Sequence, residues 1–347
     1  MTMRRRSRWP AYACVLTALL VFGLAGPPAP AGAPGAPGPA GAPDPAGAPG
    51  PAGAPGPARD PGAAADPRPA APPEPAGAPA PIPARAAPGI CTSSSRPALA
   101  AKLSRQIATA LRGLSSTVGI AADDPEEGIR CRYHQRWEFH SASVIKVIIL
   151  GALLYQAHGY QNLGSDQAAL AESMITYSDN DAADALWNEI GYAALQGFLA
   201  AAGMNHTMLG TDDYWGLTEV TPHDELRLLH LLITPNTVLD AASRRYALAL
   251  MADVVPEQRW GVPAGAPPDV TVHLKNGWLQ DPDLWDVNSI GDFTRDDLDY
   301  SIVILTSNDP DMAYGVATVE TVAKLINHAL ANADAAGGPD ARTGPAP

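Results

Sequence analysis

Long apolar segments are scarce in this chain, and the longest lies near its N-terminus. Residues 11–24 are apolar, four arginines precede them among residues 4–8, and small residues occupy positions 25–33. The run is too short for an ordinary transmembrane helix, and this order is typical of a secretory signal peptide. We therefore expect residues 1–33 to be a signal peptide and the protein to be secreted or located in the cell envelope. An uncleaved membrane anchor is the alternative.

Cysteine is also rare. The chain has three, of which Cys14 lies in the predicted signal peptide. Cys91 and Cys131 remain, and two cysteines in an exported protein most simply form a disulfide. Two buried free thiols and a metal site are the alternatives. Neither cysteine belongs to a closely spaced Cys/His motif, so we expect no metal and no cofactor.

Large apolar side chains are nearly absent from residues 26–88, which are almost entirely Ala, Gly and Pro. Such a segment buries too little surface to offset the entropy of ordering its backbone. Glycine does not recur at every third position, so a collagen-like helix is excluded. We interpret residues 34–89 as a disordered linker, residues 90–332 as one folded domain and residues 333–347 as a disordered tail.

The chain also lacks an excess of positive charge. The formal net charge is −13 at pH 7, which argues against a nucleic-acid partner and for a soluble protein. We expect a monomer whose partner is a small-molecule or peptide substrate.

The hydrophobic pattern of the domain changes its period along the chain. Helical spacing at 96–114 is followed by strand-like runs at 117–122 and 129–137. Further helices are predicted at 141–158, 166–176, 182–190, 193–202, 222–233, 237–254 and 317–330, and further strands at 270–274, 285–293 and 299–305. Strands at both ends predict one antiparallel sheet, with the middle helices forming a separate lobe, which is an α+β fold. We expect the active site in the crevice between them.

The helix predicted at 141–158 is apolar on nearly every side, and Ser143 and Lys146 lie three residues apart at its start. This spacing places the hydroxyl and the amine on one helix face. A buried lysine has a lowered pKa and can act as the base for a serine nucleophile. A helix-terminal serine with a surface lysine gives the same spacing, but the apolar neighbours of Lys146 favour its burial.

Two polar triplets strengthen this interpretation. Ser178-Asp179-Asn180 lies between two predicted helices, and Lys275-Asn276-Gly277 lies at the end of the strand predicted at 270–274. A capping loop and a strand-end turn are the simpler explanations of each. All three motifs, in this order on a helix, a loop and a strand, are hard to ascribe to chance.

In these motifs and in the order of its elements, the chain from about Arg96 to Asn332 resembles the penicillin-recognising serine enzymes, class A β-lactamases in particular. The resemblance extends to the segments MITYSDNDAADALW and TPHDELRLLH. It implies a three-layer α/β/α fold and a serine hydrolase that forms an acyl-enzyme with a β-lactam, amide or ester.

The resemblance also assigns catalytic roles. It implies that Ser143 is the acylated nucleophile and that Lys146 is its base or proton relay. Ser178 would pass a proton to the leaving nitrogen, and Lys275 would supply positive charge for a substrate carboxylate.

Four residues are implied to bind the substrate, namely Asn180, Asn276, Gly277 and Trp278. Asn180 would hold the substrate's amide, and the N–H groups of Ser143 and Trp278 would form the oxyanion hole. Two residues depart from the family pattern. Asn276 replaces the usual hydroxyl residue, and Trp278 stands where a small residue is usual, so its side chain would narrow or cap the crevice.

The loop from Gly210 to Thr221 shows a third departure. Class A enzymes carry there a glutamate, with an asparagine four residues on, which together hold the deacylating water. This loop has no such pair: Glu219 is followed by His223, and Asp212 and Asp213 are weak substitutes. We therefore expect acylation of Ser143 without efficient β-lactam hydrolysis.

Two other functions fit the same motifs. One is a non-catalytic module that binds cell-wall peptide or another ligand, and the other is a substrate-specific peptidase or esterase unrelated to antibiotics. Labelling with a fluorescent penicillin would separate the first of these from an acylating enzyme.

Overall fold

The computed structural model of the protein describes residues 89–211, 214–281, 283–295 and 298–336. Its internal contacts divide the chain into Met1–Ala78 and Pro79–Pro347, and every described residue belongs to the second unit. The predicted signal peptide lies outside the described residues, as do the predicted linker up to residue 88 and the predicted tail from residue 337. Within the described part of the chain, no helix combines the length and the apolarity needed to cross a membrane.

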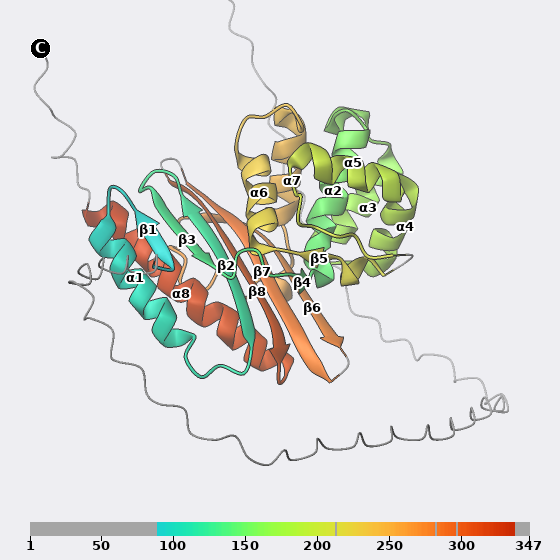
Figure 1. Ribbon diagram of the computed structural model, residues 1–347. Helices are drawn as coiled ribbons and strands as arrows, with labels where there is room; N and C mark the ends of the chain where they lie inside the picture. Colours follow the sequence, from blue (N-terminus) through green and yellow to red (C-terminus); the bar gives the residue numbers. More distant parts are fainter. Residues whose placement is uncertain (1–88, 212–213, 282, 296–297, 337–347) are drawn as a thin grey trace, which may run out of the picture. The chain divides into compact units, whose positions relative to one another are not determined.

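Six antiparallel strands form the central sheet, in the order β1–β3–β2–β8–β7–β6 (Figure 1). They are β1 (Cys91–Ser93), β2 (Thr117–Asp124), β3 (Ile129–Tyr133), β6 (Thr271–Asp281), β7 (Leu284–Arg295) and β8 (Leu298–Asp309). Strands from the two ends of the domain meet where β2 pairs with β8, as the sequence predicted. A separate pair, β4 (Phe139–His140) and β5 (Glu219–Val220), lies outside this sheet.

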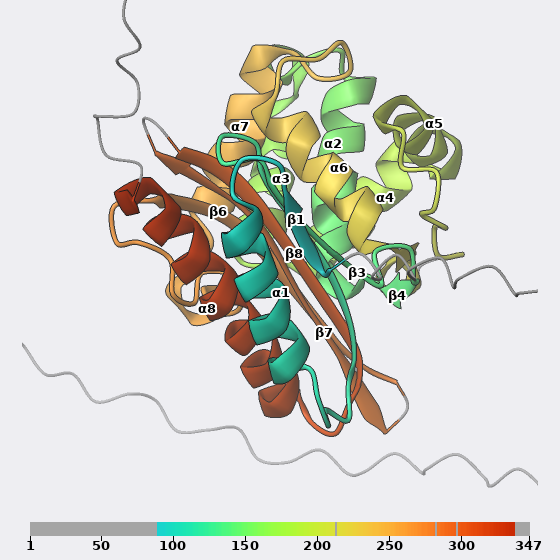
Figure 2. The same cartoon turned by 60° about the vertical axis from the view of Figure 1, so that its left-hand side comes forward.

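Helices cover both faces of the sheet and complete three layers. One face carries α1 (Pro97–Ala110) and α8 (Met312–Ala336), which lie side by side (Figure 2). The other faces a lobe of α2 (Ile145–Gln156), α3 (Ser165–Thr176), α4 (Asn180–Ile190), α5 (Tyr192–Ala202), α6 (Pro222–Ile233) and α7 (Ala241–Ala252). Neighbouring strand residues point to opposite faces, so Ile304 enters the core beneath α1 and α8 while Leu305 enters the core of the lobe. The predicted α+β fold is confirmed.

Short 3₁₀ turns join several of these elements. They are η1 (Ala142–Val144), η2 (Tyr160–Asn162), η3 (Trp215–Leu217) and η4 (Pro256–Gln258). The start of the helix predicted at 141–158 is thus η1, and the α-helix begins only at Ile145.

Several predicted ends of helices and strands were wrong. β6 continues to Asp281, so Lys275-Asn276-Gly277 lies inside the strand and not at its end. β2 continues through Asp123 and Asp124, two residues beyond the strand predicted at 117–122. α8 extends to Ala336 and therefore includes the first residues of the predicted tail. For β6 and β2, pairing with a neighbouring strand overrides the local preference for a turn or coil.

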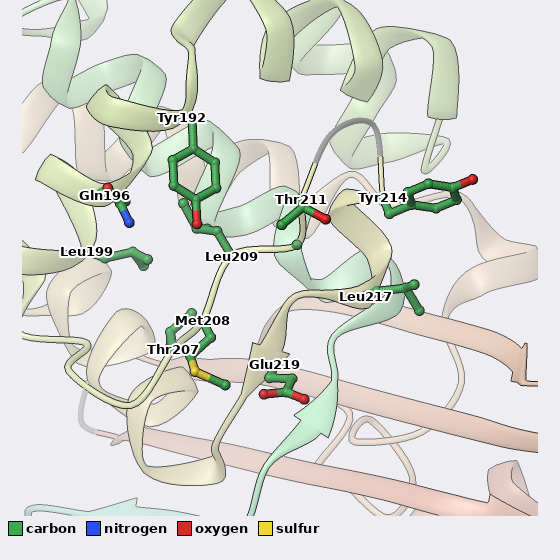
Figure 3. A pocket seen from close by; sticks show the side chains of 11 residues that line it. Tyr192, Gln196, Leu199, Thr207, Met208, Leu209, Thr211, Tyr214, Leu217 and Glu219 are labelled. Carbon is green, nitrogen blue, oxygen red and sulfur yellow. The ribbon is translucent and has the colours of Figure 1, made fainter.

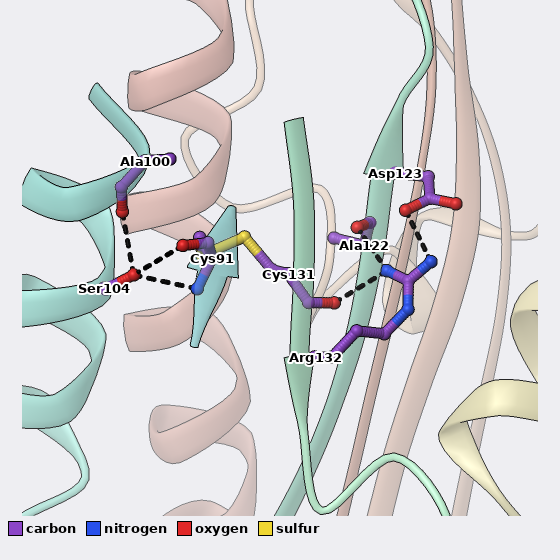
Figure 4. Close-up of a disulfide and its surroundings, with 7 residues drawn as sticks. All are labelled: Cys91, Ala100, Ser104, Ala122, Asp123, Cys131 and Arg132. Carbon is purple, nitrogen blue, oxygen red and sulfur yellow. Dashed lines mark hydrogen bonds and ion pairs between the residues drawn. A yellow bond between two sulfur atoms is a disulfide. The ribbon is translucent and has the colours of Figure 1, made fainter. Parts of the chain in front are cut away.

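The predicted disulfide between Cys91 and Cys131 is present and joins two directly paired residues of β1 and β3 (Figure 4). Ser104 on α1 accepts a hydrogen bond from the Cys91 N–H at 2.8 Å. Arg132, next to Cys131, forms an ion pair of 2.6 Å with Asp123 on β2. The disulfide therefore anchors the first strand of the domain to the sheet, and the Ser104 hydrogen bond joins this strand to α1.

Candidate active site

Ser143 lies half-buried in η1, at the entrance to the buried helix α2. The segment before it is tied to the sheet by Asn288 on β7, whose amide donates to the carbonyl oxygens of His140 (2.8 Å) and Ser141 (3.1 Å). The Asn288 side chain also accepts from the Thr306 N–H on β8. Sequence reasoning missed Asn288, because nothing in its local pattern separates it from other polar strand residues.

Lys146 lies one helical turn further on and is fully buried. Its Nζ donates to the carbonyl oxygen of Ser178 (2.5 Å), to Oδ1 of Asn180 (2.7 Å) and to Oγ of Ser178 (3.2 Å). Burial lowers the pKa of Lys146 to about 8, and the negative charges of Asp179 and Asp184 oppose this shift. A neutral, proton-accepting amine is therefore accessible near neutral pH, as a general base requires.

The loop between α3 and α4 presents Ser178 to this amine. Ser178 has a φ of 57°, a left-handed conformation that is uncommon for residues other than glycine and often occurs at functional sites. Asp179 fixes the loop by capping α4: it accepts from the N–H groups of Asp181 and Ala182 and from the hydroxyl of Ser173. Asn180, the first residue of α4, is exposed apart from its contact with Lys146.

Lys275 approaches the same serine from β6. It is fully buried, and its Nζ donates to Oγ of Ser178 at 2.9 Å and to the Asn276 carbonyl oxygen at 2.9 Å. Burial, and after it the nearby Lys146, lower the pKa of Lys275 well below its ordinary value. A positive charge on Lys275 is consequently favoured only when an anion lies close by. Ser178 thus links both lysines.

Gly277 lets β6 lie directly against the backbone around Ser143. A Cβ atom at this position would fall 2.7 Å from the Ser143 nitrogen and 2.9 Å from the Ser141 oxygen. Real Cβ atoms do not approach backbone atoms this closely, so only glycine fits here.

The alternation of β6 turns the side chains of Asn276 and Trp278 to the opposite face. Both amide hydrogens of Asn276 are donated, to the carbonyl oxygens of Gln258 (2.7 Å) and Trp260 (2.9 Å). Trp278 packs against Trp260, with ring centroids 5.8 Å apart, beside the core under α1 and α8. These side chains therefore anchor the segment before β6 and do not narrow the site, which leaves only the Trp278 main chain as a candidate for substrate contact.

The loop that joins Gly210 to Thr221 packs on the Ser143 segment. The Ser141 N–H donates to the Thr218 carbonyl oxygen at 2.8 Å, and the ring of Trp215 lies 4.9 Å from Nζ of Lys146. Asp212 and Asp213 lie outside the described residues. Glu219 has its main chain paired with Met208. Among the described residues, no carboxylate forms an ion pair with Lys146.

A separate hollow of about 600 Å³ borders the same loop (Figure 3). Tyr192 of α5 and Tyr214, Leu217 and Glu219 of the loop region line it. None of the four predicted catalytic residues does. The described residues also contain no cluster of side chains suited to a metal ion.

Residues 160–330 match a family model described as the beta-lactamase enzyme family. That match includes Ser178 and Lys275 but begins after Ser143 and Lys146. A search of curated proteins found no match.

Solved structures with the same fold include three of particular interest. A class A β-lactamase of Bacteroides cellulosilyticus is 18% identical, with a TM-score of 0.58, over 67% of this chain and 98% of its own. A β-lactamase of Xanthomonas campestris is 20% identical, with a TM-score of 0.58, over 67% and 98%. A variant of PBP-A, solved as an acyl-enzyme complex with penicillin G, is 19% identical, with a TM-score of 0.57, over 66% and 96%.

The family match over residues 160–330 and the fold shared with class A β-lactamases and PBP-A support a penicillin-recognising serine enzyme superfamily.

Proposed function

We propose that this protein is a serine hydrolase that forms an acyl-enzyme at Ser143 with a β-lactam, amide or ester. The observation that carries the proposal is the buried amine of Lys146, one turn from Ser143, with a pKa lowered to about 8. A buried lysine is costly to maintain in a fold, and with its pKa lowered towards neutral pH the amine is suited to accept a proton from a nearby hydroxyl.

In the proposed acylation, Oγ of Ser143 attacks the substrate carbonyl carbon while Lys146 accepts the hydroxyl proton. The N–H groups of Ser143 and Trp278 face the developing oxyanion, and the contact of Gly277 with η1 keeps these two backbone segments together. Ser178, within hydrogen-bond distance of both lysines, returns a proton to the leaving nitrogen. Asn180 binds the substrate amide.

A carboxylate on the substrate would complete this site. Because Lys275 is buried and close to Lys146, an anion in its vicinity favours its charged form. We therefore propose acyl donors that carry a carboxylate near the scissile carbonyl, and we expect them to acylate Ser143 faster than esters or amides of the same shape without one.

Deacylation is proposed to be slow. Among the described residues of the loop, an aromatic ring and not a carboxylate lies against Lys146. Without a positioned base for water, a contribution of roughly 10²–10⁴-fold is lost from hydrolysis of the acyl-enzyme. We further propose that the protein acts outside the cytoplasm, in keeping with its N-terminal sequence and its disulfide.

Mass spectrometry after mixing with a penicillin or an activated ester tests the proposal. We expect a persistent adduct on the peptide that contains Ser143. Ser143→Ala should abolish the adduct, and Lys146→Ala should slow its formation by about 10²-fold or more. A folded protein that binds wall peptide but is labelled by no acyl donor would instead be a binding module. Rapid turnover of β-lactams would contradict slow deacylation and direct attention to Asp212, Asp213 and Glu219.

A further inference from the structure

The general base Lys146 has a neighbour on its loop side that sequence analysis did not single out. Trp215, in η3, is 9% exposed, and its ring lies 4.9 Å from the Lys146 ammonium nitrogen. Its indole nitrogen donates a hydrogen bond of 2.6 Å to Oδ1 of Asp184, which lies on the exposed side of α4. An aspartate, an indole and a buried amine therefore form one chain of contacts from the surface to the base.

The position of Trp215 is fixed from both ends of its loop. Gly216 packs against the backbone of Ala142, and the Ser141 hydroxyl donates to the Gly216 carbonyl oxygen at 3.4 Å. The Thr218 carbonyl oxygen accepts from the Ser141 N–H. The loop that carries the indole is thereby connected to the segment that carries the nucleophile.

We propose that Trp215 and Asp184 are a positioning pair for Lys146, in which the indole shields the amine from water and Asp184 holds the indole in place. This inference rests on the proposed function, since it concerns the base of that reaction. It goes beyond it in assigning the task to two residues outside the predicted catalytic set.

The two members of the pair act on Lys146 in opposite directions. The indole removes water from the amine, which favours its neutral form, although the face of the ring also attracts the ammonium. The negative charge of Asp184 favours the charged form. Among the described residues, the other charged groups that face Lys146 are Asp179, from the α3–α4 loop, and Lys275, from β6.

This opposition gives a sharp test. The whole chain contains only four lysines, Lys102, Lys146, Lys275 and Lys324, so protein labelled with ¹³C-lysine gives four resolvable Cε signals to titrate. Lys146→Arg assigns the signal, and the exposed Lys102 and Lys324 serve as references within each spectrum. In the unsubstituted protein, Lys146 should titrate at about 8.

Asp184→Asn keeps an oxygen to accept the indole N–H but removes the charge, and should lower the Lys146 midpoint by about half a unit, because an exposed charge is screened. Trp215→Ala admits water and should raise the midpoint by about one unit. Trp215→Phe retains a buried ring without the indole N–H, so its midpoint should stay near that of the unsubstituted protein. Tyr214→Ala, a change at the neighbouring exposed aromatic residue, is the matched control and should shift nothing.

The pH profile of Ser143 acylation by an activated ester is recorded for the same proteins. Its midpoint should be lower in Asp184→Asn and higher in Trp215→Ala than in the unsubstituted protein. If the Lys146 midpoints of Asp184→Asn and Trp215→Ala shift in the same direction, or do not shift, the positioning pair is refuted, even if Ser143 is acylated normally. Opposite shifts in a protein whose Ser143 is never acylated would support the pair and refute the proposed function. Asp184 lies on the surface, so Asp184→Asn should fold even if Trp215→Ala does not. An unchanged Lys146 midpoint in Asp184→Asn would then overturn the pair.

Discussion

The two faces of the six-stranded sheet differ in what they bury. The face under α1 and α8 is filled mainly by aliphatic and aromatic side chains and is closed by the disulfide. The face towards the helical lobe also buries aliphatic residues, yet it includes Lys275 and Asp292 from the strands and meets Lys146 and Glu225 from the helices. Buried ionisable groups cost free energy of folding, and the two buried lysines lie where the proposed chemistry needs them.

β6 separates these two tasks residue by residue. Lys275 and Gly277 point to the lobe and build the site, whereas Asn276 and Trp278 point to the other face and hold the segment that leads into the strand. Substitutions on the two faces should therefore fall into two classes. Substitutions on the face under α1 and α8 should change stability and leave acylation intact. Substitutions on the lobe face should change acylation and leave stability intact.

The largest effect is expected at the disulfide. Cys91→Ala combined with Cys131→Ala removes a link across 40 residues, which stabilises by about 4 kcal/mol in the chain-entropy model. Denaturant unfolding should show this loss, while the rate of Ser143 acylation under native conditions stays the same. A matching fall in acylation would show that the two faces are not independent.

Gly277→Ala should have the converse effect. The added Cβ would fall 2.7 Å from the Ser143 nitrogen, so η1 or β6 must shift. A displacement of this size at reacting groups lowers the rate by about 10²-fold. Stopped-flow acylation measures this, with Gly197→Ala on α5 as the control, because no atom lies within 4 Å of a Cβ added there. Equal acylation by both variants would contradict the role given to Gly277.

The sequence predicted which sides of the helices and strands face a core better than it predicted the contacts within the site. Periodicity located most helices and strands because apolar spacing reflects which side faces a core. It ended the strand at Leu274, just before Lys275-Asn276-Gly277, whereas pairing of Gly277 with Asn288 on β7 carries the strand onward. Trp215, Asp184 and Asn288 were missed because their partners are distant in the sequence, and no local pattern encodes such contacts.

The third effect concerns the pH dependence of stability and sharpens the comparison further. Glu225 on α6 is fully buried, and neither carboxylate oxygen has a hydrogen-bond partner among the described residues. Burial, and after it the charge of Asp224, raise the pKa of Glu225 to about 8. Asp292 on β7 is also fully buried, which raises its pKa to about 7.

The folded protein therefore keeps these protons at pH values where the unfolded chain releases them. Stability conferred in this way is complete below the ordinary carboxyl pKa and is lost as pH rises towards 8. Glu225→Gln cannot titrate, so it should reduce this fall in unfolding free energy by about 1.4 kcal/mol per pH unit within the window. Denaturant unfolding between pH 5 and 8, with Asp292→Asn as a second variant, measures the slopes. If Glu225→Gln and the unsubstituted protein lose stability equally as pH rises, Glu225 is ionised in the fold, and the lobe face holds a buried negative charge that its neighbours must balance.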